Sequence, residues 1–279
     1  MLIGEALKMV RETLYPKYGD FAVPQSEEIL LFFLKCSRSD LYLNSTKQIN
    51  PELIPELKQI LKRMLNNEPL GYILGTVFFY SREFEINSDV LIPRPDTETL
   101  VEEILSNEKM DRCRFVDAGI GSGIIACVLK ESRPQWEAYG IDISYNALKV
   151  ASKNCSNQVS LACCDLFSSF KPCRFFDFIV SNPPYISENE FFLLDQSVRN
   201  HEPYHALYGG EDGLDFYRRL AVESKGILRN NGRIYCEIGF NQKKPVKEIF
   251  TECGWSNIII KDDLGRNPRV IRAVLKDNK

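Results

Sequence analysis

The spacing of hydrophobic and polar residues changes along the chain and divides it into three parts. In Leu53–Leu65 the apolar side chains recur every three or four residues, and lysines and an arginine occupy the other face. This period predicts an amphipathic helix with Pro51 or Pro55 in its first turn, where a missing N–H costs little. Similar patterns over Leu2–Leu14 and Ser26–Lys35 predict that residues 1–70 form a small helical domain. Breaks between its helices are expected at Pro16, Gly19 and Pro24.

Aromatic and β-branched residues dominate the second part of the chain, which lies between Pro69 and Pro95. Such residues favour extended backbone, because their side chains pack well on a pleated surface. We therefore expect residues 71–96 to form a β-hairpin that turns near Ser81 to Glu83. This hairpin is predicted to link the helical domain to the rest of the chain.

From Thr97 onward, short apolar runs alternate with amphipathic segments, a pattern typical of an α/β protein whose mostly parallel sheet is covered by helices on both faces. Residues 97–279 are expected to form one large domain. The predicted strands are Arg114–Asp117, Glu137–Asp142, Val159–Cys163, Asp177–Ser181, Gly232–Ile238, Asn257–Lys261 and Val270–Leu275. The predicted helices are Thr97–Ser106, Gly123–Glu131, Tyr145–Asn154, Gly213–Leu228 and Gln242–Cys253.

Three glycines at alternate positions, Gly119, Gly121 and Gly123, follow the first predicted strand of this domain and open a helix. Glycines let a backbone bend tightly and approach a ligand closely, and a helix N-terminus presents free N–H groups. The loop that begins at Asp117 therefore predicts a site for a nucleotide-like ligand. Its spacing matches neither GxGxxG nor GxxxxGK[ST], which argues against a dinucleotide or a nucleoside triphosphate. A dinucleotide site and a purely structural turn stay as alternatives.

Two acidic residues follow the next predicted strands. Asp142 ends the second strand, a position from which a carboxylate can accept hydrogen bonds from both hydroxyls of a ribose. The alternative is that Asp142 caps a helix starting near Ser144. Asp165 follows the third strand, where its carboxylate or the neighbouring backbone can reach an adenine amino group. For Asp165 the alternative is a helix cap or a turn.

The tetrapeptide Asn182-Pro183-Pro184-Tyr185 directly follows the fourth apolar strand. Because proline cannot continue a central strand, the chain must leave the sheet at its carboxyl edge, where open α/β sheets bind ligands. The side-chain oxygen of Asn182 and the carbonyl of Pro183 can accept the N–H groups of a planar amide or amine and aim its lone pair at a methyl donor. Tyr185 can stack on the planar group. We interpret the loop as catalytic; a proline-rich turn with a surface tyrosine is the alternative.

Composition limits the class of protein. The formal net charge is −3, so no general positive field attracts the chain to nucleic acid. The longest apolar run near the start, Ile29–Leu34, is too short to span a bilayer, and no targeting signal is recognisable. A cytoplasmic protein without membrane contact is expected. The nine cysteines form no CxxC pair, which favours free thiols over a metal or redox site.

Taken in order, these motifs resemble those of the release-factor glutamine methyltransferases of the HemK/PrmC type. The matching segments are Pro69–Gly75, Leu91–Glu98, Asp117–Gly123, Ile141–Ser144, Ala147-Leu148, Phe176–Ile186, Glu202-Pro203, Ala206-Leu207, Gly209-Gly210, Asp212–Leu214, Asp263–Gly265 and Arg269-Val270. The tetrapeptide alone is shared with DNA adenine and ribosomal RNA guanine methyltransferases, whereas the ordered set is far more specific. Ala118, Ile120 and Asp96 depart mildly from the family's usual residues. Leu166 stands where some members have an aromatic residue, which leaves open what covers an adenine face.

The resemblance implies a class I methyltransferase fold, in which a Rossmann-like seven-stranded sheet has an antiparallel last strand and follows a helical domain that contacts the protein substrate. S-adenosylmethionine would be the cofactor, S-adenosylhomocysteine its product, and no metal would be needed. The residues implied for cofactor binding are Asp117, Gly119, Ile120, Gly121, Ser122, Gly123, Asp142, Asp165, Leu166 and Asn182. Catalysis would depend on Asn182, Pro183 and Tyr185. Substrate binding would depend on Asn182, Pro183, Pro184, Tyr185 and Arg94.

The implied reaction is N5-methylation of the glutamine in the Gly-Gly-Gln motif of peptide-chain release factors. Two other acceptors stay as alternatives, namely a glutamine of a ribosomal protein and an exocyclic amine in DNA or RNA. A cofactor-binding scaffold without activity is a third alternative, disfavoured by the presence of Asp117, Asp142 and the tetrapeptide. We expect a release factor as protein partner, no direct contact with nucleic acid, and a monomer.

Overall fold

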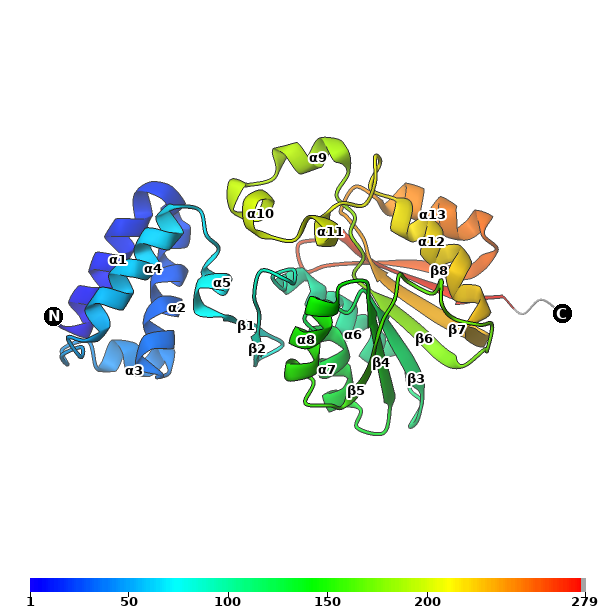
Figure 1. The fold of residues 1–279 in the computed structure, drawn as a ribbon, viewed down its shortest axis with the longest axis horizontal. Helices are drawn as coiled ribbons and strands as arrows, with labels where there is room; N and C mark the ends of the chain where they lie inside the picture. The colour runs from blue at the N-terminus through cyan, green and yellow to red at the C-terminus, as the bar shows by residue number, and fades with distance from the viewer. Residues whose placement is uncertain (277–279) are drawn as a thin grey trace. The chain divides into compact units, whose positions relative to one another are not determined.

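The computed structural model describes residues 1–276, and these residues form two compact units. The first unit comprises Met1–Gly75 together with Gln196–His201, and the second comprises Thr76–Asp195 and the described residues from Glu202 onward (Figure 1). Each unit encloses hydrophobic cores of its own. Within residues 1–276, no helix is long and apolar enough to cross a membrane.

The first unit is helical. Its elements are α1 (Ile3–Tyr18), η1 (Gly19–Phe21), α2 (Ala22–Leu34), α3 (Arg38–Leu43), α4 (Leu53–Leu65), α5 (Leu70–Leu74) and α10 (Gln196–His201). The apolar faces of α1, α2 and α4 meet in one core that buries Leu14, Leu30 and Met64. The predicted helical N-terminal region is thereby confirmed, and its stability comes from these packed faces.

The expected helix breaks at two prolines are wrong. Pro24 lies in the first turn of α2, where N–H groups have no partner within the helix and proline therefore removes no hydrogen bond. Pro16 lies in the last turn of α1, so it removes a single bond while Val10 and Leu14 remain buried against the core. At Gly19, with φ of 55°, the helix ends as expected.

A seven-stranded sheet organises the second unit. Its strands are β3 (Arg114–Ala118), β4 (Glu137–Asp142), β5 (Val159–Cys163), β6 (Phe176–Ser181), β7 (Leu228–Glu237), β8 (Trp255–Asp262) and β9 (Pro268–Leu275). They lie in the order β5-β4-β3-β6-β7-β9-β8. The first five strands are parallel, and β9 runs antiparallel to both β7 and β8. The predicted α/β fold, with an antiparallel last strand, is confirmed.

Helices cover both faces of this sheet (Figure 1). One face packs on α6 (Glu98–Asn107), α7 (Ile124–Ser132) and α8 (Tyr145–Asn154), and the other packs on α12 (Asp215–Glu223) and α13 (Lys243–Glu252). The remaining elements are η2 (Pro95–Thr97), α9 (Glu188–Leu193), α11 (Tyr204–Leu207) and η3 (Ser224–Gly226). The sequence did not predict α9 and α11, because helices of this length are too short to show a period.

The hairpin consists of β1 (Thr76–Phe79) and β2 (Arg82–Glu85). Its turn lies at Tyr80 and Ser81, which have φ of 51° and 60°. The turn therefore includes Ser81 but starts one residue before the expected Ser81 to Glu83, and Arg82 and Glu83 already belong to β2. Phe79 and Phe84 are both buried in the core beneath one face of the sheet. Their burial sets the register, because a shift by one residue would turn both side chains outward.

The predicted helix Gly213–Leu228 is too long. Ser224–Gly226 forms a 3₁₀ turn, and Leu228 already pairs with Phe176 at the start of β7. The strand expected from Gly232 therefore begins earlier. Pairing with β6 overrides the helical spacing of the apolar residues here, since the strand buries them in the sheet.

The prediction that all nine cysteines are free is wrong for two of them. Cys127 of α7 and Cys155, directly after α8, form a disulfide with Cα atoms 5.3 Å apart. Both residues are buried where the two helices pack against each other. They are 28 residues apart in the sequence, so only the packing of α7 on α8 brings them together.

Candidate functional site

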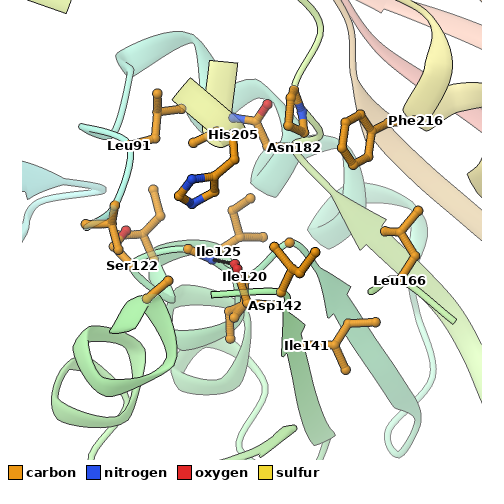
Figure 2. Close-up of a pocket in the computed structure, with 18 of the residues that line it drawn as sticks. Leu91, Ile120, Ser122, Ile125, Ile141, Asp142, Leu166, Asn182, His205 and Phe216 are labelled. Atoms are coloured by element: carbon orange, nitrogen blue, oxygen red, sulfur yellow. Dashed lines mark hydrogen bonds between the residues drawn. The ribbon is translucent and has the colours of Figure 1, made fainter. Parts of the chain in front are cut away.

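A pocket lies at the carboxyl ends of the central parallel strands, where the loops that follow these strands meet (Figure 2). The predicted site residues that line it are Arg94, Gly119, Ile120, Gly121, Ser122, Asp142, Asp165, Leu166, Asn182 and Pro184. The predicted residues that do not line it are Asp117, Gly123, Pro183 and Tyr185. The fold thus gathers loops from four different strands around one cavity. The binding role of each residue stays a prediction.

The glycine loop is tied to the end of β4. The amides of Gly119 and Ile120 both donate to the carbonyl of Ile141, each at 2.9 Å. The three glycines have φ of 73°, 53° and 83°, in the left-handed region that other residues rarely adopt. The sequence pattern of glycines at alternate positions therefore reflects the backbone conformation of this loop.

Asp142 is held rigidly at the edge of the pocket. Its Oδ2 accepts a hydrogen bond from the amide of Gly121 at 2.9 Å, and its Oδ1 accepts one from the amide of Ser144 at 2.8 Å. The alternative that Asp142 caps α8 is wrong, because the Ser144 hydroxyl is the cap and accepts the amide of Ala147. Each carboxylate oxygen of Asp142 has a second lone pair that is free to accept from a ligand.

Asp165 is engaged by a cation. Its Oδ1 lies 2.7 Å from Nη1 of Arg219, which also pairs through Nε with Glu223 at 2.7 Å. Leu166 is buried beside it, and Ile141 and Phe216 line the same side of the pocket (Figure 2). These three apolar side chains form a slot suited to a flat aromatic group.

Asp117 is a buried carboxylate without a partner. It is 1% exposed, and neither of its oxygens has a hydrogen-bond partner among the described residues. Burial raises the pKa of Asp117 to about 8, although the nearby Ala126 amide acts in the opposite direction. Buried polar groups in folded proteins are rarely left unpaired, so Asp117 is a candidate to receive a donor group from a ligand, and this role stays a prediction.

Asn182 lines the pocket, and its Nδ2 lies 3.4 Å from Oγ1 of Thr97. The Thr97 hydroxyl donates to Oε2 of Glu237 at 2.7 Å. Tyr185 points its hydroxyl at the other oxygen of Glu237, at 3.4 Å, and burial raises its pKa. Tyr185 therefore packs behind the pocket, and its predicted stacking on a substrate gains no support from this position.

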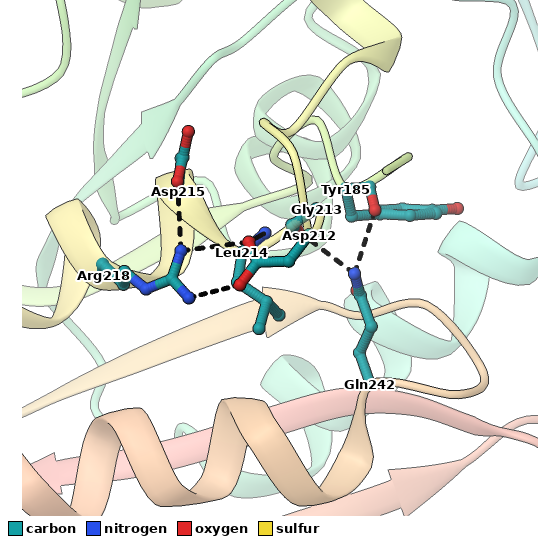
Figure 3. Close-up of polar contacts among 7 residues, drawn as sticks. All are labelled: Tyr185, Asp212, Gly213, Leu214, Asp215, Arg218 and Gln242. Carbon is teal, nitrogen blue, oxygen red and sulfur yellow. Dashed lines mark hydrogen bonds and ion pairs between the residues drawn. The ribbon is translucent and has the colours of Figure 1, made fainter. Parts of the chain in front are cut away.

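The loop that contains Tyr185 is fixed from below by Gln242 (Figure 3). The Nε2 of Gln242 donates to the carbonyls of Tyr185 and Gly213 at 2.9 and 3.1 Å. Its Oε1 accepts from the amide of Gly239 at 3.0 Å. It also lies 3.3 Å from the hydroxyl of Tyr217, whose single proton points to the nearer carbonyl of Glu237 at 2.9 Å. Both donors of the Gln242 amide and one of its two lone pairs are therefore used.

Gly213 must be a glycine for this loop to pack. Its φ is 76°, and a Cβ atom there would lie 2.4 Å from the carbonyl oxygen of Tyr185. The loop after β6 is therefore held by Gln242 on one side and by close backbone approach on the other. We therefore expect Gln242 and the close backbone contact to hold the Asn182 side chain in a defined position.

Arg94 reaches the pocket from the segment after the hairpin. Its Nη2 lies 2.6 Å from Oε1 of Glu202, whose side chain is 1% exposed. The family resemblance implied Arg94 as a substrate-binding residue and included Glu202 only as part of a matching segment. Their ion pair shows that the two segments meet at the wall of the pocket.

Sequence reasoning missed several lining residues, among them Leu91, Thr97, His205 and Phe216. Figure 2 shows the His205 ring pointing into the pocket. Leu91 and Thr97 belong to a segment whose resemblance to the family was recognised, but nothing in their spacing assigned them to the site. Within residues 1–276, no three His, Cys, Asp or Glu side chains lie close enough together to hold a metal ion.

Comparisons with known proteins match both parts of the chain. Residues 5–75 match the PrmC N-terminal domain family, and residues 95–201 match the methyltransferase small domain family. The release factor glutamine methyltransferase of Thermodesulfovibrio yellowstonii is 36% identical over 278 residues, which cover 96% of this chain and 97% of that protein. The release factor glutamine methyltransferase of Bacillus subtilis is 36% identical over 91% of this chain and 92% of its own length.

A solved structure shows the same fold. The crystal structure of a methyltransferase from Pyrococcus furiosus superimposes with a TM-score of 0.54 and 16% identity, covering 78% of this chain and 99% of that chain. At this identity the likeness concerns the fold alone. It agrees with the class I methyltransferase architecture described above.

Proposed function

Because this chain belongs to the family of release factor glutamine methyltransferases, we propose that it transfers a methyl group from S-adenosylmethionine to N5 of the glutamine in the Gly-Gly-Gln motif of a release factor. The observation that carries the proposal is the place of Asn182. It follows a central strand and faces the pocket across from Ile120 and Ser122 of the glycine loop (Figure 2). A group that can hold a substrate amide thus shares one cavity with a nucleotide-type loop.

The residues of the pocket fit S-adenosylmethionine. Asp142 lines the pocket, and its free lone pairs suit the ribose hydroxyls. Asp117 does not line the pocket but lies near the end of β3, just before the glycine loop, and its unpartnered carboxylate suits the ammonium group. The apolar slot made by Ile141, Leu166 and Phe216 suits adenine. When bound, S-adenosylmethionine supplies an electrophilic methyl group on a positively charged sulfur.

Asn182 and Pro183 prepare the acceptor nitrogen. The lone pair of an amide nitrogen is delocalised into its carbonyl, which makes it a poor nucleophile. The Asn182 Oδ1 and the Pro183 carbonyl each accept one N–H of the substrate amide, which orients the lone pair and favours a pyramidal nitrogen. We expect no metal and no strong base to take part, because the nitrogen can lose its proton after the transfer.

The two structural units support a division of labour. We propose that residues 1–70 dock the protein substrate, that residues 71–96 link the two parts, and that residues 97–279 carry out catalysis. The match to a separate N-terminal domain family supports this, as does the independent core of the helical unit. Phe21 and Leu43, which are 74% and 81% exposed on that unit, are candidates for contact with the substrate. The enzyme would work as a monomer in the cytoplasm, where release factors act, without direct contact with nucleic acid.

The test incubates the protein with labelled S-adenosylmethionine and a purified release factor. The matched control is the same release factor with the glutamine of its Gly-Gly-Gln motif replaced by alanine. We expect label on the first protein and none on the second, with mass spectrometry placing the methyl group on that glutamine. Label on a ribosomal protein or a nucleic acid, with an unlabelled release factor, would support one of the alternative acceptors instead.

A further inference from the structure

A buried carboxylate behind the catalytic loop has no part in the mechanism above. Glu237 ends β7, is 1% exposed, and lies between Thr97 of η2 and Tyr185 of the loop after β6. Burying a carboxylate is costly unless hydrogen bonds compensate for the lost water. Here Thr97 and Tyr185 provide two such bonds, at 2.7 and 3.4 Å. Both partners connect Glu237 to the site of methyl transfer.

The chemistry of these groups gives the hydrogen bonds a direction. An ionised carboxylate can only accept, so the Thr97 hydroxyl must donate its single proton to Glu237. The lone pairs of Thr97 then remain to accept from a donor. The group 3.4 Å away is Nδ2 of Asn182, which is a donor. In the series of hydrogen bonds from Asn182 through Thr97 to Glu237, each group therefore donates to the next.

We propose that Thr97 and Glu237 are positioning residues that hold the Asn182 amide with its NH₂ group inward and its oxygen toward the acceptor nitrogen. This inference rests on the proposed function, because it gives the Asn182 oxygen the role of accepting the N–H of a substrate amide. The oxygen and nitrogen ends of an asparagine amide have nearly the same shape, so packing alone does not select between them. With the amide turned over, Asn182 would present N–H groups to a substrate that also presents N–H groups.

Protonation of Glu237 would reverse this chain of hydrogen bonds. A neutral carboxyl can donate to Thr97, which can then donate to Asn182 and turn its amide over. Burial raises the pKa of Glu237 to about 7, against smaller lowering effects of the Thr97 hydrogen bond and of Arg269 on β9. The other charged or titratable groups that face Glu237 are Asp96 of η2, Tyr185 of the catalytic loop and Tyr217 of α12. The rate of methyl transfer should therefore fall as the pH drops through about 7.

Thr97 offers a matched pair of variants. Thr97→Val has nearly the same shape but no hydroxyl, and Thr97→Ser keeps the hydroxyl. The Thr97 side chain makes no capping hydrogen bond to α6, so valine leaves the start of that helix intact. Single-turnover transfer to a release factor at saturating cofactor should slow on the order of tenfold in Thr97→Val and recover in Thr97→Ser. In Glu237→Gln the step in rate near pH 7 should disappear.

A second measurement does not depend on activity. In ¹⁵N-labelled enzyme the side-chain NH₂ signals of Asn182, assigned by their loss in Asn182→Ala, should shift with a midpoint near pH 7. They should be insensitive to pH in Thr97→Val and sensitive in Thr97→Ser. An Asn182 signal that does not respond to pH in the wild type, or a Thr97→Val variant with the wild-type rate and pH profile, would overturn the inference. If the NMR result holds while the wild type leaves release factors unmethylated, the proposed function fails and the positioning of Asn182 stands.

Discussion

Two carboxylates in the same sheet, Asp117 on β3 and Glu237 on β7, are each 1% exposed but differ in their hydrogen bonding. Glu237 accepts hydrogen bonds from two side chains of the protein, whereas Asp117 has no hydrogen-bond partner among the described residues. A buried polar group whose hydrogen-bond partners are side chains of the protein has a structural role. A buried group left unsatisfied is a candidate for contact with a ligand.

The same difference in hydrogen bonding distinguishes the two sides of the pocket, the cofactor side and the acceptor side. On the proposed cofactor side, the amides of Gly119 and Gly121 are already bonded within the protein, whereas the carboxylate of Asp117 has no partner among the described residues. On the acceptor side, Asn182 and its loop are held by Thr97, Glu237 and Gln242 before any substrate arrives. Substitutions on the two sides should therefore affect different steps, namely cofactor affinity and the rate of transfer.

The largest effect is expected for Asn182→Ala, which removes the side-chain oxygen proposed to accept an N–H of the substrate amide. Turnover should fall on the order of 100-fold or more, because the substrate amide loses the contact that orients its lone pair. Cofactor affinity, measured by calorimetry, should change much less. Transfer near the wild-type rate would show that the acceptor side does not work through Asn182.

On the cofactor side, Asp142→Ala should weaken S-adenosylmethionine by about 1.5 to 3 kcal/mol for each charged hydrogen bond lost. The Gly121 and Ser144 amides also lose their acceptor, so the loop becomes less ordered. Calorimetric titration measures the affinity, and turnover at saturating cofactor is the internal control. An unchanged dissociation constant would place the ribose partner elsewhere.

Replacing Gln242 by leucine tests the support beneath the catalytic loop. Leucine leaves the carbonyls of Tyr185 and Gly213 and the amide of Gly239 without their partner. The free energy of unfolding should decrease by about 1 to 3 kcal/mol, the cost of unsatisfied buried polar groups. Denaturant titration gives this value. The exposed Gln158→Leu is the matched control and should change stability by less than about 0.5 kcal/mol.

The smallest expected effect is the contribution of Asp117 to the pH dependence of cofactor affinity. A bound cation favours the ionised carboxylate, so a protonated Asp117 must release its proton on binding, and cofactor affinity should rise with pH up to about 8. In the ligand-free protein the raised pKa works the other way, because it favours the folded state at low pH and this contribution is lost as the pH rises through about 8.

Calorimetric titration of the wild type and of Asp117→Asn with the cofactor, in buffers with different ionisation enthalpies, counts the protons released on binding. Below pH 8 the wild type should release close to one proton more than Asp117→Asn, whose affinity should vary less with pH. Equal proton release by the two proteins would mean that Asp117 does not meet the cofactor's cation.

The sequence by itself determined the features that depend on local backbone chemistry. Alternate glycines predicted the loop at Gly119 to Gly123, because each takes a positive φ. Two prolines after an apolar strand predicted that the chain leaves the sheet at Asn182, as it does at the end of β6. Hydrophobic period predicted β4, β5 and α8 with the bounds that the structure shows. Such signals lie within a few residues of one another, so the chain expresses them without its tertiary context.

Only the tertiary structure decided which distant side chains meet. Thr97 and Glu237 are 140 residues apart and come together because β7 pairs with β6 beside the catalytic loop. Cys127 and Cys155 meet through the packing of two helices, and no local pattern assigns His205 of α11 or Phe216 of α12 to the pocket that they line. A buried carboxylate looks the same in the sequence whether it is satisfied or unsatisfied. Its role depends on whether hydrogen-bond partners lie next to it in the folded protein.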